Sequence, residues 1–176
     1  FRHALLRDAA YGLLSAEERV AWHAAAGLFL ERAGERDASL LAEHYRIGNQ
    51  LAQAAHWYAK AAEQAHDAAA MEAALACTER GMACGAAGAA RGALLSVRIA
   101  IGFWQNEFQD ILRMAPEALS LLPAGGKLWC QIFVGFFPAL THLPQRELLG
   151  NFLGQFLAVD PSSDALASYV RALAYL

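Results

Sequence analysis

One stretch of this chain decides its fold: Ser39-Leu-Leu-Ala-Glu-His-Tyr-Arg-Ile-Gly48-Asn-Gln-Leu-Ala-Gln-Ala-Ala-His-Trp-Tyr-Ala-Lys-Ala-Ala-Glu63. Asp37, just before it, is a residue type that caps helices, and it predicts a helix that ends at Gly48. Asn49 is expected to cap a second helix, which runs to about Ala65. The stretch therefore predicts two helices joined by a tight turn.

The composition of the whole chain favours the same local structure. Of the 176 residues, 57% are hydrophobic and 18% are charged, so the chain can bury a large core. Alanine is abundant, whereas valine, isoleucine and threonine are scarce. This balance favours helix over strand because β-branched side chains lose rotamer freedom in a helix. We expect an all-α fold of about nine helices.

Similar helix boundaries recur along the chain. Ser15 and Glu18 have the spacing of a capping box, which predicts the start of a helix. Gly34 fits the end of that helix. The glycine-rich stretch 85–92 predicts a connector, and Asn106 is expected to cap a later helix.

Prolines mark the second half of the chain. Pro116 and Pro138 fall inside expected helices, where each should kink or break the helix. Pro116 also fits the first residue of a restarted helix. Pro144 and Pro161 each predict the start of a further helix.

The expected helix pairs recur at roughly 34 to 38 residues, a period typical of an α-solenoid. The segment 39–63 resembles one tetratricopeptide repeat, a family with small residues where two helices cross. The matching residues are Leu41, Ala42, Tyr45, Gly48, Ala54, Tyr58 and Ala61. A second match contains Ala115, Ala118 and Pro123, and a weaker one contains Ala74, Thr78 and Gly81. The weaker match would make residues 52–66 the first helix of a repeat, whereas the match over 39–63 places them in the second helix. Which helices pair within one repeat therefore stays open. The resemblance implies a right-handed α-solenoid of tetratricopeptide-like hairpins.

The opening of the chain resembles another family. The residues are Phe1-Arg-His-Ala-Leu-Leu-Arg-Asp-Ala-Ala-Tyr11, then Leu13-Leu14, Glu18-Arg19 and His23. They are similar to the end of the winged-helix region in bacterial signal-transduction ATPases with numerous domains, of the STAND or AAA type. The run Leu40-Leu-Ala-Glu-His-Tyr45, with Gly48, resembles the first repeat downstream in that family. The resemblance covers residues 1 to about 82.

This second resemblance implies a domain organisation. Residues 1–35 would be adaptor helices after an NTPase and winged-helix module, and residues 36–176 would be the repeat array. Because the chain opens on Phe1, we expect it to be a piece of a longer protein. Tyr169, Leu173 and Leu176 give the C-terminus an apolar face, whereas solenoids normally end with a polar cap. We therefore expect truncation at the C-terminus, with further repeats in the parent, and the alternative is a dimer formed through this end. Relatives of this kind are commonly fused to a serine/threonine kinase, an adenylate or guanylate cyclase, or a LuxR-type DNA-binding domain.

Motifs for chemistry are lacking in the sequence. The six histidines form no His-Glu-x-x-His pattern, and no Cys-x-x-Cys is present. Gly125-Gly126-Lys127 lacks the spacing of a phosphate-binding loop. Ser96, Asp110 and a histidine are the residue types of a catalytic triad. A triad is recognised by its geometry, however, which the sequence does not supply. We expect no catalytic, cofactor or metal site, and an enzyme only in the parent protein.

Charge and cysteine content narrow the partners and the compartment. The net charge is −3 with no basic stripe, so nucleic acid is not an expected partner. The three cysteines are an odd number, which favours a reducing, cytoplasmic compartment. The longest apolar run, 128–140, is too short to span a membrane.

Aromatic residues offer the one candidate binding surface. Trp129, Phe133, Phe136 and Phe137 recur at helical spacing, and Trp104 lies in another aromatic cluster. This spacing is typical of the buried face of a helix, but it also fits a groove for a partner helix or an apolar ligand. We hypothesise that these five residues bind a partner.

The function predicted from the sequence is a non-catalytic interaction or regulatory module of a larger signalling ATPase. A protein or peptide would bind in the concave groove of the repeats, and the first helices would contact the upstream NTPase module. Two alternatives remain. One is an effector sensor with an apolar pocket for a small molecule, and the other is a structural spacer.

Overall fold

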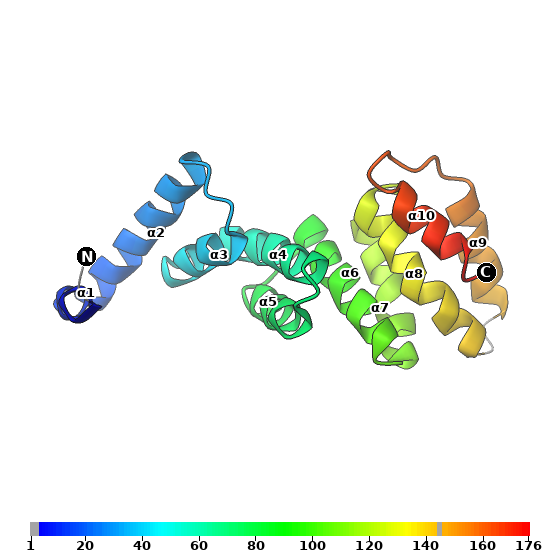
Figure 1. Cartoon of the computed structure of the whole chain (residues 1–176), viewed down its shortest axis with the longest axis horizontal. Coiled ribbons are helices and arrows are strands. Elements are labelled where there is room, and N and C mark those ends of the chain that lie inside the picture. Colours follow the sequence, from blue (N-terminus) through cyan, green and yellow to red (C-terminus); the bar gives the residue numbers. More distant parts are fainter. Residues whose placement is uncertain (1–3, 144–145) are drawn as a thin grey trace.

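The computed structural model describes residues 4–143 and 146–176. Within these residues the chain forms ten α-helices and no strand, which confirms the all-α class and corrects the expected count of about nine. The helices are α1 (Ala4–Gly12), α2 (Ala16–Arg32), α3 (Ala38–Ile47), α4 (Leu51–Asp67), α5 (Met71–Ala83), α6 (Gly88–Trp104), α7 (Phe108–Leu121), α8 (Lys127–His142), α9 (Arg146–Leu157) and α10 (Leu166–Leu173). They follow one another along an elongated molecule, with α1 at one end and α9 and α10 at the other (Figure 1).

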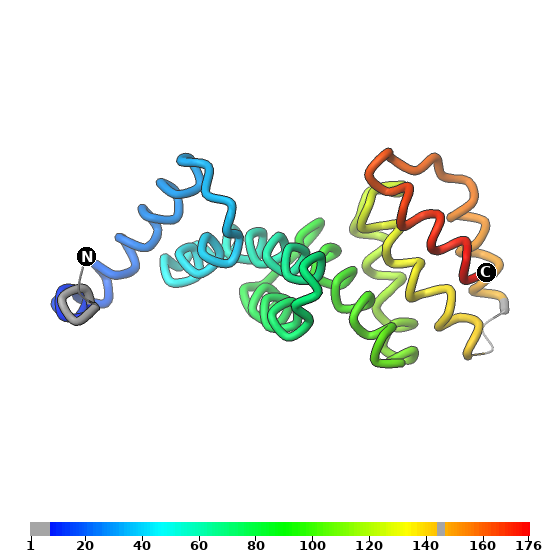
Figure 2. Tube along the Cα trace, viewed as in Figure 1, coloured from blue at the N-terminus to red at the C-terminus, as the bar shows by residue number. Residues whose placement is uncertain are grey.

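The helices pack in a repeating order. Each helix from α2 to α8 packs against the next one along the chain. Alternate helices also pack together: α4 on α6, α6 on α8, and α8 on α10. The helices α4, α6, α8 and α10 therefore form one continuous layer, onto which α3, α5, α7 and α9 pack. Figure 2 traces the chain through these helices, from the middle of the molecule to its C-terminal end.

Helices α2 to α6 all end in the same way. The residue after each C-cap has a positive φ: Gly34 (81°), Asn49 (55°), Ala69 (58°), Gly85 (78°) and Asn106 (58°). The next N–H then donates to the carbonyl oxygen five residues back, in the pairs Glu35 to Leu30 (3.0 Å), Gln50 to Tyr45 (2.8 Å), Ala70 to Ala65 (2.8 Å), Ala86 to Gly81 (3.3 Å) and Glu107 to Gly102 (2.9 Å). This is the Schellman pattern, which stops a helix sharply and satisfies its last carbonyls.

Two predicted N-caps are wrong for this reason. Asn49 and Asn106 do not cap the helices that follow them, because both occupy the left-handed region that ends the preceding helix. The N-cap residues of α4 and α7 are instead Gln50 and Glu107, and their side chains form no capping hydrogen bond. The predicted capping box of Ser15 and Glu18 is confirmed. The Asp37 cap is also confirmed, because its carboxylate accepts the N–H groups of Ser39 and Leu40 at 3.0 Å each.

The glycine-rich connector is shorter than predicted. Helix α6 begins at Gly88 rather than Gly92, since the intervening alanines and arginine are strong helix formers. Gly92 lies inside α6, at a position where the end of α7 packs too closely for a side chain. A Cβ at this position would be 2.8 Å from Cγ of Leu122.

Neither internal proline ends its helix. Helix α7 continues through Pro116 and α8 continues through Pro138, so neither a break at these prolines nor a restarted helix at Pro116 is found. The expected helix start at Pro144 lies outside the described residues. The start expected at Pro161 is displaced to Leu166, because Ser162 is engaged elsewhere: its N–H and its hydroxyl donate to the carbonyl of Gly125 at 3.0 and 3.1 Å.

Two hydrophobic cores meet on α6. The first lies between α3, α4, α5 and α6 and includes Tyr58 and Leu94. The second lies between α6, α7, α8, α9 and α10 and includes Ile99 and Phe133. Because α6 contributes buried side chains to both cores, it couples the two halves of the chain.

Helix α2 packs on α3 at the N-terminal end of the molecule. A Cβ at Gly48 would lie 2.6 Å from the backbone nitrogen of Ala24, so the two helices meet at very close range. Nearby, Nδ1 of His23 lies 3.2 Å from Nδ1 of His44. The other side of α2 is open, since Trp22 is 64% exposed and Phe29 is 70% exposed.

Ala69→Gly should stabilise the chain by about 0.5–1 kcal/mol. Ala69 holds a φ of 58°, which costs a residue with a Cβ about 1 kcal/mol or more and costs glycine little. Urea unfolding monitored by circular dichroism measures the change in the free energy of unfolding. The control is Ala68→Gly, at a φ of −83°, which should destabilise instead. A loss of stability on Ala69→Gly would contradict the argument.

Candidate functional site

The predicted aromatic surface is divided between core and solvent. Four of its five members lie on α8 and are buried: Trp129, Phe133, Phe136 and Phe137. Their burial fits the core interpretation, and it does not fit the hypothesis that these four side chains contact a partner. Trp104, at the end of α6, is 72% exposed. Trp104 is therefore the one member of the predicted set that a partner can reach.

Trp104 does not stand alone. Phe103 contacts it with ring centroids 5.5 Å apart. Tyr175, just after α10, contacts Phe103 at 5.4 Å in an edge-to-face arrangement. We call Phe103, Trp104 and Tyr175 the aromatic platform. It brings together residues from distant parts of the sequence, because α10 packs on α8 and α8 packs on α6.

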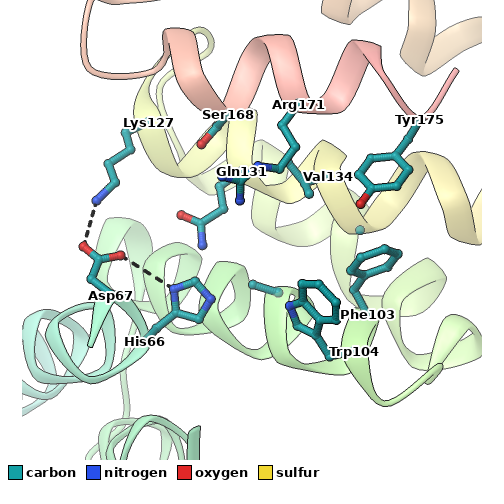
Figure 3. A pocket seen from close by; sticks show the side chains of 12 residues that line it. His66, Asp67, Phe103, Trp104, Lys127, Gln131, Val134, Ser168, Arg171 and Tyr175 are labelled. Atoms are coloured by element: carbon teal, nitrogen blue, oxygen red, sulfur yellow. Dashed lines mark hydrogen bonds and ion pairs between the residues drawn. The ribbon is translucent and has the colours of Figure 1, made fainter. Parts of the chain in front are cut away.

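A cavity of about 200 Å³ adjoins the aromatic platform. It lies between the C-terminal end of α4 and the helices α6, α8 and α10 (Figure 3). Its polar lining consists of His66, Asp67, Lys127, Gln131, Ser168 and Arg171. In Figure 3, Gln131 and Arg171 lie between the aromatic platform and the pair His66 and Asp67. The cavity thus has an aromatic end and a polar end.

A second, more open hollow of about 510 Å³ also borders the aromatic platform. It shares Phe103, Trp104 and Tyr175 with the first cavity and reaches Phe108 and His142, whose rings stack with centroids 4.5 Å apart. We call the two hollows together the platform groove. Both hollows are bordered by the same three aromatic residues, so a ligand that fills both would contact the aromatic platform.

The charged groups of the groove differ in their pairing. Nζ of Lys127 donates to Asp67 Oδ2 at 3.1 Å, and this ion pair links α8 to α4. Nδ1 of His66 lies 3.7 Å from the other oxygen of Asp67. The guanidinium of Arg171 has neither a hydrogen-bond nor an ion-pair partner among the described residues. The groove therefore presents one uncompensated positive charge.

The residues considered for catalysis do not come together. The hydroxyl of Ser96 donates to the carbonyl of Leu128 at 3.2 Å, and Asp110 pairs with Arg113. Among the described residues, no group of three or more His, Cys, Asp or Glu is placed to hold a metal ion. His23 and His44 form a pair only, and burial together with the charges of His44 and Arg46 lowers the pKa of His23.

The cysteines are buried and unpaired in disulfides. They are Cys77, Cys84 and Cys130. Burial raises the pKa of all three thiols, and it raises that of Cys130, assisted by the charge of Asp164, to about 11. Since the thiolate is the reactive form, these groups act as small apolar core residues.

Sequence reasoning missed the contribution of α10. The C-terminal face was interpreted as apolar through Tyr169, Leu173 and Leu176. Tyr169 packs into the core, with its ring 4.4 Å from that of Phe156, whereas Leu173 and Leu176 are exposed. The groove is lined instead by Ser168, Arg171 and Tyr175. Their spacing of three and four residues was the available signal, because it places them on one face.

Comparisons with known proteins give no relative. No protein-family model, no curated protein and no solved structure matches the chain. None of the helices in the described part of the chain has both the length and the apolar character needed to cross a bilayer.

Proposed function

We propose that this chain is a non-catalytic helical-repeat module that binds an extended peptide segment of a partner protein in the platform groove. The observation that carries the proposal is the exposure of Trp104 within an aromatic cluster. A tryptophan that is 72% exposed gains a large apolar contact when a partner covers it. Tryptophan and tyrosine are also the residues that most often dominate binding energy at interfaces.

The packing order supports a repeat architecture. Continuous contact between α4, α6, α8 and α10 is the arrangement expected of a solenoid, in which each hairpin covers its neighbour. We propose a right-handed α-solenoid of tetratricopeptide-like hairpins, with α4, α6 and α8 as the first helices of successive pairs. This choice follows the two sequence matches at Ala74 and at Ala115 rather than the match at Ala54.

The size of the groove favours a peptide over a small effector molecule. Sites for small molecules are usually enclosed and measure about 300–1,000 Å³. The better-enclosed cavity here has about 200 Å³, and the larger hollow beside it is open. An extended chain can use both hollows by laying side chains into each. A spacer without a ligand would have no need of an exposed aromatic cluster beside an unpaired arginine.

The wider role in our proposal rests on the resemblance at the N-terminus. We assign the chain to a cytoplasmic bacterial signal-transduction ATPase, in which peptide binding by the repeats regulates the NTPase module. The open side of α2, with Trp22 and Phe29, would contact the upstream part of such a parent. The ATPase rate of the parent should then respond to deletion of the repeats, and an unchanged rate and signal response would contradict this role.

Panning of a phage-displayed library of random peptides tests the peptide-binding function. We expect the library to yield binders whose affinity falls about tenfold or more on Trp104→Ala, as for an aromatic residue that anchors an interface. The matched control is Trp22→Ala, which removes another exposed tryptophan outside the groove. Failure to enrich any peptide, or equal losses in the two variants, would overturn the proposal.

A further inference from the structure

Arg171 differs from the arginines of the helical layers that precede it. All five arginines of α3 to α8 form ion pairs with carboxylates: Arg46 and Arg80 with Glu43, Arg91 with Glu117, Arg98 with Glu107, and Arg113 with Asp110. Arg171 has no carboxylate partner among the described residues, yet it lines the cavity beside the aromatic platform. A guanidinium offers a fork of N–H donors that matches a carboxylate. The groove therefore has an unused site for an acidic group.

The surroundings of Arg171 suit an acceptor ligand. Gln131, on α8, lies between Arg171 and His66 in the cavity (Figure 3). The hydroxyl of Ser168 lies one helical turn from Arg171 on the same side of α10. These side chains add hydrogen-bond donors around the guanidinium. The one carboxylate of the cavity, Asp67, is already engaged by Lys127 at 3.1 Å.

The charge of the groove is opposite to that of the chain. The groove residues that carry charge at neutral pH are Lys127, Arg171 and Asp67, which leave one positive charge with histidine neutral. The whole chain has a net charge of −3. A positive groove on an acidic protein attracts acidic segments selectively, because the rest of the surface repels them.

We propose that the groove binds an internal acidic segment of a partner protein. A Glu or Asp side chain of that segment pairs with Arg171, and an apolar side chain next to it packs on Trp104. The inference rests on the proposed function and specifies the chemistry of the peptide. An internal segment is favoured over a chain terminus because Phe103, Trp104 and Tyr175 line both hollows, so a bound chain that fills both continues past Trp104.

Fluorescence anisotropy with defined peptides tests the inference. The probe is a fluorescein-labelled, C-terminally amidated peptide of alternating glutamate and leucine, and its match has glutamine at every glutamate. The wild-type chain should bind the glutamate peptide about tenfold or more tightly, as expected for a charge-assisted hydrogen bond. Arg171→Gln should remove this preference, whereas Arg113→Gln, which removes the same charge outside the groove, should keep it. Circular dichroism verifies that both variants fold.

The outcomes separate this inference from the function on which it rests. Equal affinity for the two peptides, with binding lost on Trp104→Ala, overturns the acidic preference and leaves the peptide-binding function in place. Failure to bind either peptide also overturns the acidic preference. If panning then yields no binder that depends on Trp104, the proposed function fails as well. A preference for glutamate that survives Arg171→Gln overturns the role of Arg171.

Discussion

Phe133→Ala should cost the chain about 3–5 kcal/mol of its free energy of unfolding, the range measured for large aromatic side chains removed from cores. Phe133 is completely buried on α8. Its ring centroid lies 4.8 Å from that of Trp129, 4.9 Å from that of Phe137 and 4.7 Å from that of Phe156. Truncation therefore leaves a cavity lined by rigid rings, which close in only partly.

Urea unfolding measured by circular dichroism gives the change in stability. The expected loss is a large fraction of the roughly 5–15 kcal/mol that stabilises a typical domain, so the variant should unfold at a much lower urea concentration. Phe29→Ala is the matched control, because Phe29 is 70% exposed on α2 and its removal should change stability little. Similar stabilities for the two variants would mean that the aromatic residues of α8 do not form part of a core.

This comparison also separates the two interpretations of the aromatic stripe that the sequence left open. Helical spacing predicted that Trp129 and Phe133 share a face, but spacing does not say whether another helix covers that face. The answer depends on α9 and α10, which supply Phe156 and Tyr169 to the same core. Such contacts join residues far apart in sequence, and periodicity within one helix contains no information about them.

The ends of helices were predictable from the sequence where the residue type at the boundary has one dominant structural role. Ser15 with Glu18, Asp37 and Gly34 each mark a helix end by a local bond or by glycine's freedom at positive φ, and all three predictions are confirmed. Asparagine has two uses, as an N-cap and as a residue that tolerates positive φ. Asn49 was assigned to the first use and takes the second.

The candidate groove was much less predictable than the helices. Trp104 was named from its aromatic neighbourhood alone. Arg171 was not named, because an arginine in a sequence carries no sign of whether an acid will lie beside it. Its significance depends on the fold, which pairs every arginine of α3 to α8 with a carboxylate and brings Arg171 to the cavity beside Trp104.

Glu43→Gln should destabilise the chain by about 2 kcal/mol, because Glu43 joins three helices through charge-assisted hydrogen bonds. Its carboxylate on α3 accepts from the hydroxyl of Tyr58 on α4 at 2.6 Å and from Arg80 on α5 at 2.7 Å. Arg46 donates to it at 2.8 and 3.0 Å. Glutamine cannot satisfy all of these donors, and Tyr58 is fully buried. Partial exposure of the Glu43 side chain keeps the expected loss below that of a fully buried ion pair.

The same interaction should make the loss depend on pH. Partial burial alone raises the pKa of Glu43, but the bonds from Tyr58 and Arg46 and the charges of Arg46 and Arg80 outweigh it and leave the pKa below its ordinary value. The folded state therefore binds this proton less readily than the unfolded state does. The contribution of Glu43 is complete above about pH 4.3, the ordinary glutamate value, and is lost as the pH falls through the lower folded pKa.

Urea unfolding of the wild type and Glu43→Gln across this acidic range measures the effect. The stability gap should stay constant from neutral pH down to the ordinary glutamate pKa and should narrow below it. Glu117→Gln is the control, because Glu117 forms a comparable ion pair with Arg91 on the surface, where solvent screens it, and its removal should matter little. A gap that stays constant at all pH values would show that Glu43 acts through its shape and packing. A gap as small as that of Glu117 would show that the three helices are held together by their apolar contacts alone.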